Sequence, residues 1–174
     1  MKPGRQIFRW FSIAVAVVVT GYLLYVDQPS PIEGQLPGDA IPVSIQRISD
    51  GDSFKLRDGT RVRLLGIDAP ELDQAYGRQS RKDLIKFTDT VVYLKQKDID
   101  SYGRVVGVLW TAEGVNVNQA MVCSGSAWWY ERYAANNTAL RGCQRSARDQ
   151  RRGLWAANNP VAPWQWRRDG ASRR

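Results

Sequence analysis

The chain has 174 residues, a formal net charge of +8 and no histidine, which predicts one domain with extensions and excludes mechanisms that need a histidine base or histidine metal ligands. Two cysteines are too few for the usual four-ligand structural zinc site, so carboxylates must hold any bound metal, which favours calcium or magnesium. Residues 141–174 carry nine arginines against two aspartates, a charge that suits a nucleic acid or an anionic lipid surface or that only keeps the protein soluble.

Residues 10–26 form an uncharged run between Arg9 and Asp27. A membrane-spanning helix needs about 17–25 apolar residues, whereas the apolar region of a secretory signal has only about 7–15 and ends at small residues. The basic segment 1–9 should stay in the cytoplasm. We predict that residues 10–26 are an uncleaved transmembrane signal anchor, with a cleaved signal peptide as the alternative.

Residues 27–40 contain several prolines and glycines and no apolar period, which is typical of a linker. The folded domain is predicted over residues 41–157. Residues 158–174 form a tail rich in tryptophan and arginine.

Five segments of the domain are strand-like: residues 43–48, 53–57, 60–67, 91–95 and 104–110. Asp58-Gly59 predicts a tight hairpin between the second and the third of them. Helices are predicted over Tyr76–Phe87, from the cap Asn116 to Gly125, and from Asn137 or Thr138 to Gly153. This order predicts an α+β, mainly β domain, a five-stranded OB-fold barrel with about three helices.

The segment 63–71 brings one arginine and two acids together. Strand alternation would place Arg63 on the same face as Leu65 and Ile67, and Pro70 must end the strand, so that Asp68 and Glu71 flank a tight turn. An arginine on a core strand needs an anionic partner. A salt bridge at a strand end would explain the segment, and so would a metal-assisted reaction on a phosphate.

Two further segments carry the same chemistry, Asp50-Gly51-Asp52-Ser53 and Tyr102-Gly103-Arg104. Two arginines offer bidentate donors to phosphate, and acids on adjacent strands can share one hard cation. A remaining acid can orient or deprotonate water. Phosphodiester cleavage needs these three elements.

With these motifs the chain resembles the staphylococcal nuclease (thermonuclease) family over roughly residues 43–155. Residues 117–125, Gly153-Leu154-Trp155 and the closing segment 163–168 add to the resemblance. It implies an OB-fold domain and calcium-dependent hydrolysis of DNA and RNA at the P–O5′ bond, which leaves 3′-phosphate ends. The closing segment looks like the tail of secreted bacterial members. Together with the predicted anchor, this predicts a single-pass protein of the bacterial inner membrane with its domain in the periplasm or outside the cell; secretion after signal cleavage is the alternative.

Matched by motif, the resemblance gives a role to each site residue. It implies that calcium is bound by Asp52, Asp68 and the Ala69 carbonyl, that the scissile phosphate is held by Arg63 and Arg104, and that the attacking water is oriented or activated by Glu71. Tyr102 would lie near the phosphate, and Tyr133 would stack on a base. We expect the protein to act as a monomer.

The chain departs from the family pattern at three places. The segment after Glu71 is shorter than in the founding enzyme, Ser53 replaces the usual threonine, and Glu131 stands where that enzyme has a second substrate-facing tyrosine. The alternatives to an enzyme are a catalytically silent OB-fold module that binds nucleic acid, and a membrane-tethered scaffold. Silent relatives should have lost Arg63, Glu71 or Arg104, and this chain keeps all three.

Cys123 lies near the end of one predicted helix and Cys143 near the start of the next. A disulfide between them is reasonable if the domain lies outside the cytoplasm. Two buried free thiols are the alternative.

Overall fold

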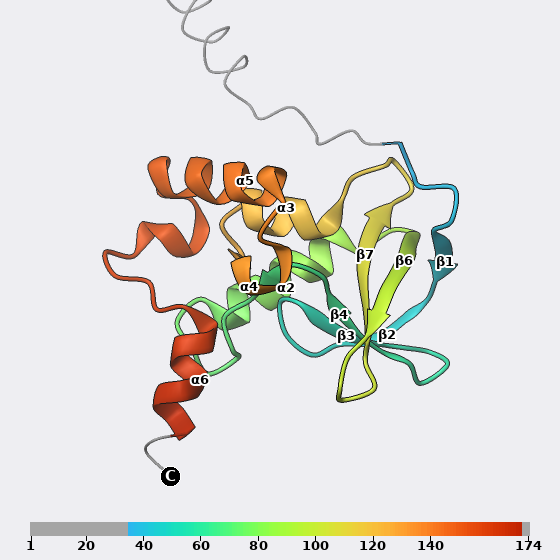
Figure 1. The fold of residues 1–174 in the computed structure, drawn as a ribbon, viewed down its shortest axis with the longest axis horizontal. Helices are drawn as coiled ribbons and strands as arrows, with labels where there is room; N and C mark the ends of the chain where they lie inside the picture. The colour runs from blue at the N-terminus through green and yellow to red at the C-terminus, as the bar shows by residue number, and fades with distance from the viewer. Residues whose placement is uncertain (1–34, 172–174) are drawn as a thin grey trace, which may run out of the picture. The chain divides into compact units, whose positions relative to one another are not determined.

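The structure, a computed structural model, describes residues 35–171 and is shown in Figure 1. The predicted anchor, residues 10–26, and most of the predicted linker lie outside this range. Among the helices of residues 35–171, none is both long and apolar enough to cross a bilayer. The strands are β1 (Ile41–Val43), β2 (Ile45–Ile48), β3 (Ser53–Leu56), β4 (Arg61–Leu64), β5 (Ile67–Asp68), β6 (Val92–Ile99), β7 (Val105–Thr111) and β8 (Trp128–Trp129). The helices are α2 (Gly77–Phe87), α3 (Val117–Cys123), α4 (Glu131–Ala134), α5 (Thr138–Asp149), the 3-10 helix η1 (Gly153–Ala156) and α6 (Pro163–Ala171).

Six strands form one sheet in the order β1-β6-β7-β4-β3-β2, in which only the β4–β7 pair is parallel. β1 and β2 lie at its two edges, although only Ser44 separates them in sequence. A sheet whose opposite edges are joined by one residue has to curl. The result is the curled half-barrel seen in Figure 1, with the helices gathered beside it, which confirms the mainly β, OB-like expectation.

The predicted count of five strands is wrong. The predicted strand 43–48 breaks at Ser44 into β1 and β2, and the predicted strand 60–67 breaks at Leu65 and Gly66 into β4 and β5. Gly66 has a φ of 75°, which ends the extended conformation. The prediction that Leu65 and Ile67 continue the same strand and share a face with Arg63 is therefore wrong, because strand β4 ends at Leu64. β8, which pairs with β5, was not predicted.

The helix caps follow the sequence closely, whereas the helix count does not. The side chain of Asn116 accepts a hydrogen bond from the Gln119 N–H at 3.0 Å, and that of Asn137 accepts one from the Leu140 N–H at 3.0 Å. The expected end of the last helix at Gly153 is wrong, because α5 ends at Asp149 and Gly153 begins η1. Residues 35–171 hold five α-helices rather than about three, since α4 and α6 were not predicted.

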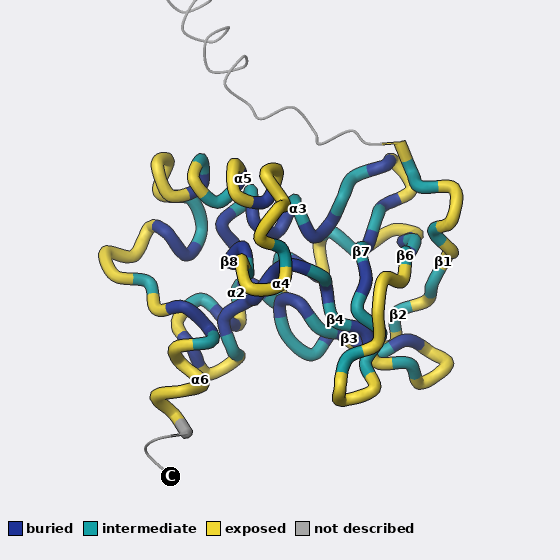
Figure 2. Tube along the Cα trace, in the orientation of Figure 1, coloured by how far each residue is buried: buried dark blue, intermediate teal, exposed yellow. Residues whose placement is uncertain are grey.

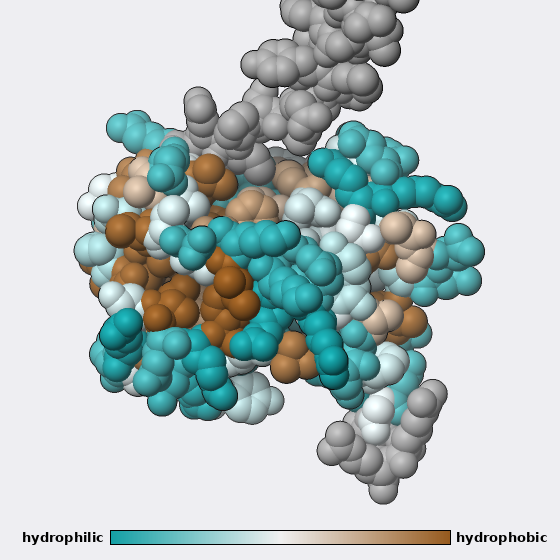
Figure 3. Space-filling model, turned by 180° about the vertical axis from the view of Figure 1, so that it is seen from behind, coloured by the Kyte–Doolittle hydropathy of each residue, from teal (hydrophilic) through white to brown (hydrophobic). Residues whose placement is uncertain are grey.

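Two apolar clusters hold the domain together, and Figure 2 shows their buried segments. The first fills the inside of the sheet and includes Phe54, Leu64, Leu109 and Met121. The second joins α5, η1 and the tail, and consists of Trp128, Ala147, Leu154, Trp155 and Ala162, with Trp164 packed against it. Seen from behind, the sheet side of the molecule exposes a hydrophobic area that hydrophilic side chains border (Figure 3).

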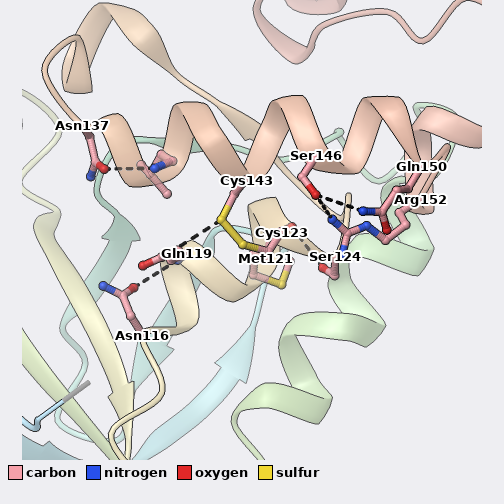
Figure 4. Close-up of a disulfide and its surroundings, with 11 residues drawn as sticks. Asn116, Gln119, Met121, Cys123, Ser124, Asn137, Cys143, Ser146, Gln150 and Arg152 are labelled. Carbon is pink, nitrogen blue, oxygen red and sulfur yellow. Dashed lines mark hydrogen bonds between the residues drawn. A yellow bond between two sulfur atoms is a disulfide. The ribbon is translucent and has the colours of Figure 1, made fainter. Parts of the chain in front are cut away.

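A disulfide joins Cys123, the last residue of α3, to Cys143 on α5. Figure 4 shows that it lies between the two helices, beside Gln119. Of the two alternatives from the sequence, the structure has the disulfide.

Removing this disulfide should lower the free energy of unfolding. The bridge closes a segment of 20 residues, and loop closure of that size accounts for about 3 kcal/mol in the chain-entropy model. We expect Cys123→Ala with Cys143→Ala to lose about that amount in urea unfolding. Dithiothreitol should destabilise the wild type and leave the double variant unchanged; equal unfolding midpoints of oxidised wild type and double variant would contradict this expectation.

Candidate active site

The first acid of the site comes from the turn between β2 and β3. A Cβ atom at Gly51 would overlap the Ser80 hydroxyl of α2, so only glycine lets this turn lie so close to the helix. The turn directs Asp52 inward, where the residue is 2% exposed. One Asp52 oxygen accepts a hydrogen bond from the Ala69 N–H at 2.7 Å, and the other accepts one from the Ser53 hydroxyl at 2.7 Å.

The second acid comes from β5, which the glycine turn at Leu65 and Gly66 separates from β4. Asp68 is fully buried and pairs across the small sheet with Trp128 of β8. Ala69 and Pro70 behind it are buried as well, whereas the Glu71 side chain is 34% exposed. The motif therefore delivers a buried carboxylate and, three residues later, a carboxylate at the rim that solvent can reach.

Arg63 joins the two buried acids. The register of the β3–β4 hairpin places Arg63 opposite Ser53, and its guanidinium lies 2.6 Å from an Asp52 oxygen and 2.7 Å from an Asp68 oxygen. Burial alone would lower the pKa of Arg63, but the charges of Asp52 and Asp68 outweigh it and raise the pKa. The arginine is therefore held charged between two carboxylates.

A second arginine, which the sequence did not predict for the site, comes from α6. Arg167 Nη2 lies 2.7 Å from an Asp68 oxygen, and Nη1 lies 2.7 Å from a Glu71 oxygen. Its partial burial would lower its pKa, but the hydrogen bonds and charges of these two acids raise it. In the sequence, only the segment 163–168 pointed to this part of the chain. It contributed to the family resemblance, but no role was assigned to its residues.

The cluster carries more negative than positive charge. The acids are Asp50, Asp52, Asp68 and Glu71, and Arg63 and Arg167 bind the last three of them. Burial and the nearby charges of Asp52 and Glu71 raise the pKa of Asp50 to about 7, because another negative charge is unfavourable there. Such a cluster favours an added cation.

In residues 35–171 no three acid, histidine or cysteine side chains converge as metal ligands would. The Arg63 guanidinium lies between the two carboxylates that the resemblance assigns to the metal, and the Arg167 guanidinium binds one of them, Asp68. The donors themselves, two buried carboxylates and a backbone carbonyl, are hard oxygen ligands of the kind that calcium prefers. The residues therefore fit such an ion by chemistry and by charge.

Three predicted residues lie apart from the cluster and have other partners. Arg104 immediately precedes β7, the strand next to β4, and binds Asp100 at 2.7 Å. Tyr102 is 72% exposed, with its ring 5.5 Å from the Arg104 guanidinium carbon. Tyr133 is 63% exposed and packs edge-on against Tyr130. The structure thus brings together Asp52, Arg63, Asp68, Ala69 and Glu71, and leaves the other three on neighbouring surface.

Comparison with known proteins agrees with the resemblance found in the sequence. The family model described as "Staphylococcal nuclease homologue" matches residues 61–157. The chain is 44% identical over 131 residues to an "Uncharacterized endonuclease" of Escherichia coli, a match that covers 71% of this chain and 82% of that protein. It is 38% identical over 181 residues to a "Micrococcal nuclease" of Shigella flexneri, covering 97% and 96%. It is 40% identical over 132 residues to an "Uncharacterized endonuclease" of Haemophilus influenzae, covering 71% of each.

Proposed function

This chain belongs to the staphylococcal nuclease family, and on that premise we propose that it is a calcium-dependent nuclease. It hydrolyses DNA and RNA at the P–O5′ bond and leaves 3′-phosphate ends. The observation that carries the proposal is the acid-rich cluster in which Arg63 bridges Asp52 and Asp68, with Glu71 at its rim. Two buried acids, a partly exposed acid and a bridging arginine are more than a strand-end salt bridge needs.

Calcium would be held by the Asp52 and Asp68 carboxylates and the Ala69 carbonyl. Bound there, the ion would supply a positive charge for the phosphate oxygens and make a bound water more acidic. The excess of carboxylates over arginines in the cluster supports a site that takes up a cation.

The chain's own residues account for the remaining steps. Arg63 and Arg104 would each present two N–H groups to the phosphate oxygens and stabilise the charge that develops on them. Glu71 would accept the proton of the attacking water, because its carboxylate is reachable from solvent and lies next to the buried acids. The 5′ oxygen of the following nucleotide leaves and takes up a proton from solvent, which gives a 5′-hydroxyl beside the 3′-phosphate.

Removing the metal should abolish the activity. We expect the purified full chain to digest plasmid DNA and single-stranded RNA in calcium, and to leave both intact in a calcium chelator. DNA fragments should accept nucleotides from terminal transferase only after a phosphatase has removed the 3′-phosphate. Digestion at the same rate in chelator, or fragments that can be extended at once, would refute the proposed chemistry.

A silent nucleic-acid-binding module is the second candidate. It would bind nucleic acid without cleaving it under any of these conditions. The presence of Arg63, Glu71 and Arg104 favours the enzyme, since a module that only binds has no use for a partly exposed acid beside the arginines. The digestion in calcium separates the two candidates.

We further propose that residues 10–26 anchor the protein in a bacterial inner membrane with its domain outside the cytoplasm. The disulfide between Cys123 and Cys143 supports an oxidising compartment. The protein should stay in the membrane pellet after alkaline extraction, and protease added to spheroplasts should degrade the domain. Recovery of a soluble form that starts near residue 28 would favour the cleaved signal peptide instead.

A further inference from the structure

A groove lies beside the carboxylate cluster and has no part in the mechanism so far. Its volume is about 770 Å³, which falls within the range of ordinary ligand sites, about 300–1,000 Å³. One wall is the segment 128–132, which contains β8 and the start of α4; another is α6; and α5 supplies Gln144 and Arg148. Figure 1 labels α4, α5 and α6.

The charge of the groove is opposite to that of the cluster. Four arginines line it, against the single acid Glu131, and all five of these residues are exposed. The arginines are Arg132, Arg148, Arg167 and Arg168. Planar guanidinium groups in this number suit the phosphates of a nucleic-acid strand.

Aromatic side chains lie among these arginines. Trp164 stacks on Tyr130 with the two rings 5.1 Å apart and almost parallel, and it meets Trp128 edge-on at 5.4 Å. Trp164 and Tyr130 are half-buried, so the pair keeps a defined orientation at the groove. Aromatic rings interleaved with basic residues are typical of surfaces that bind single strands, because the bases of a single strand are free to stack.

Arg167 connects the groove to the cluster. It lines the groove and at the same time binds Asp68 and Glu71. Arg63, which is proposed to hold the phosphate, binds the same Asp68, so a strand held there can continue past Arg167 onto the arginines and aromatic rings of the groove.

From this arrangement we propose that the groove between residues 128–132 and α6 is a subsite for single-stranded nucleic acid, adjoining the phosphate that is cleaved. This inference rests on the proposed nuclease function, because the position of the subsite is defined relative to the phosphate that is cleaved. It gives the C-terminal tail a role in holding substrate.

The test measures binding without cleavage. The full chain, kept in a calcium chelator, is titrated into a fluorescein-labelled twelve-nucleotide oligothymidylate at several salt concentrations. Arg132→Gln with Arg168→Gln should weaken binding about tenfold or more and make the salt dependence shallower by about 1.4, because each lost phosphate contact removes about 0.7 from the slope for a single strand.

The matched control removes the same charge elsewhere. Arg57→Gln with Lys86→Gln changes two exposed basic residues that do not line the groove, and it should bind the oligonucleotide within about twofold of the wild type. A hairpin duplex of equal charge should bind the wild type and the groove variant alike. The subsite is overturned if the groove and control variants bind the oligonucleotide equally, or if the groove variant loses as much affinity for the duplex.

Parallel digestion in calcium separates this inference from the nuclease proposal. If the wild type does not cleave but the groove variant loses binding, the groove stands as a strand-binding site and the nuclease proposal fails. If the wild type cleaves and the groove variant binds normally, the nuclease proposal stands and the subsite fails.

Discussion

Replacing Glu71 by glutamine is expected to lower kcat for calcium-dependent cleavage by about 10²–10⁴-fold, the usual contribution of a general base. Glutamine keeps the size of the side chain and can still accept a hydrogen bond from Arg167, which binds a Glu71 oxygen at 2.7 Å. It cannot take the proton of the attacking water. The effect should therefore fall on kcat, with KM nearly unchanged, since the groups proposed to hold the phosphate are intact.

The control for this experiment is Glu113→Gln, the same chemical change in the exposed turn between β7 and α3. We expect this variant to cleave as the wild type does. Both variants should also unfold at nearly the same urea concentration as the wild type, because Glu71 is one third exposed and Glu113 is fully exposed. Wild-type kcat in Glu71→Gln would remove Glu71 from the mechanism, and a misfolded variant would be recognised by its unfolding curve.

The parts of the site that could be predicted are those that short-range sequence rules position. Asp58-Gly59 fixes the β3–β4 hairpin, and that hairpin places Ser53, and with it Asp52, opposite Arg63. Asp68 and Glu71 follow within eight residues of Arg63. Local turn chemistry and strand pairing were therefore enough to bring these residues together.

The parts that could not be predicted depend on long-range packing. Arg167 lies 99 residues from Asp68 in the sequence and reaches it only because α6 is held by Trp164, which packs on the second apolar cluster. No apolar period in residues 158–174 indicates that helix. In the same way, β8 has only two residues, and the separation of β1 from β2 follows from the curl of the sheet rather than from the residues around Ser44.

Replacing Arg63 by methionine is expected to cost about 3–5 kcal/mol in the free energy of unfolding, measured in a calcium chelator. That is the usual loss when one partner of a buried ion pair is removed. Here the loss leaves Asp52 and Asp68, 2% and 0% exposed, without the guanidinium that bridges them. Methionine fills much of the same volume, so the loss reports mainly the uncompensated charge.

Arg61→Met is the matched control, because Arg61 lies on the same strand but is exposed and donates a hydrogen bond to the Tyr102 carbonyl rather than to a buried acid. It should lose less than about 1 kcal/mol, as exposed charged groups do. If Arg61→Met and Arg63→Met are equally destabilised, the loss at residue 63 does not come from the buried acids.

A second substitution tests the cause directly. In Arg63→Met, Asp68 keeps its contact with Arg167, whereas Asp52 loses its cationic partner. Adding Asp52→Asn removes that unpaired charge, so the double variant should recover part of the stability that Arg63→Met loses, in a double-mutant cycle. Calcium should also stabilise Arg63→Met more than it stabilises the wild type, because the ion binds the folded state and supplies the missing positive charge beside Asp68. Both effects are expected only if Arg63 holds the two acids together in the metal-free protein. Additive losses in the cycle, together with an equal gain from calcium in both proteins, would show that Arg63 acts independently of these acids.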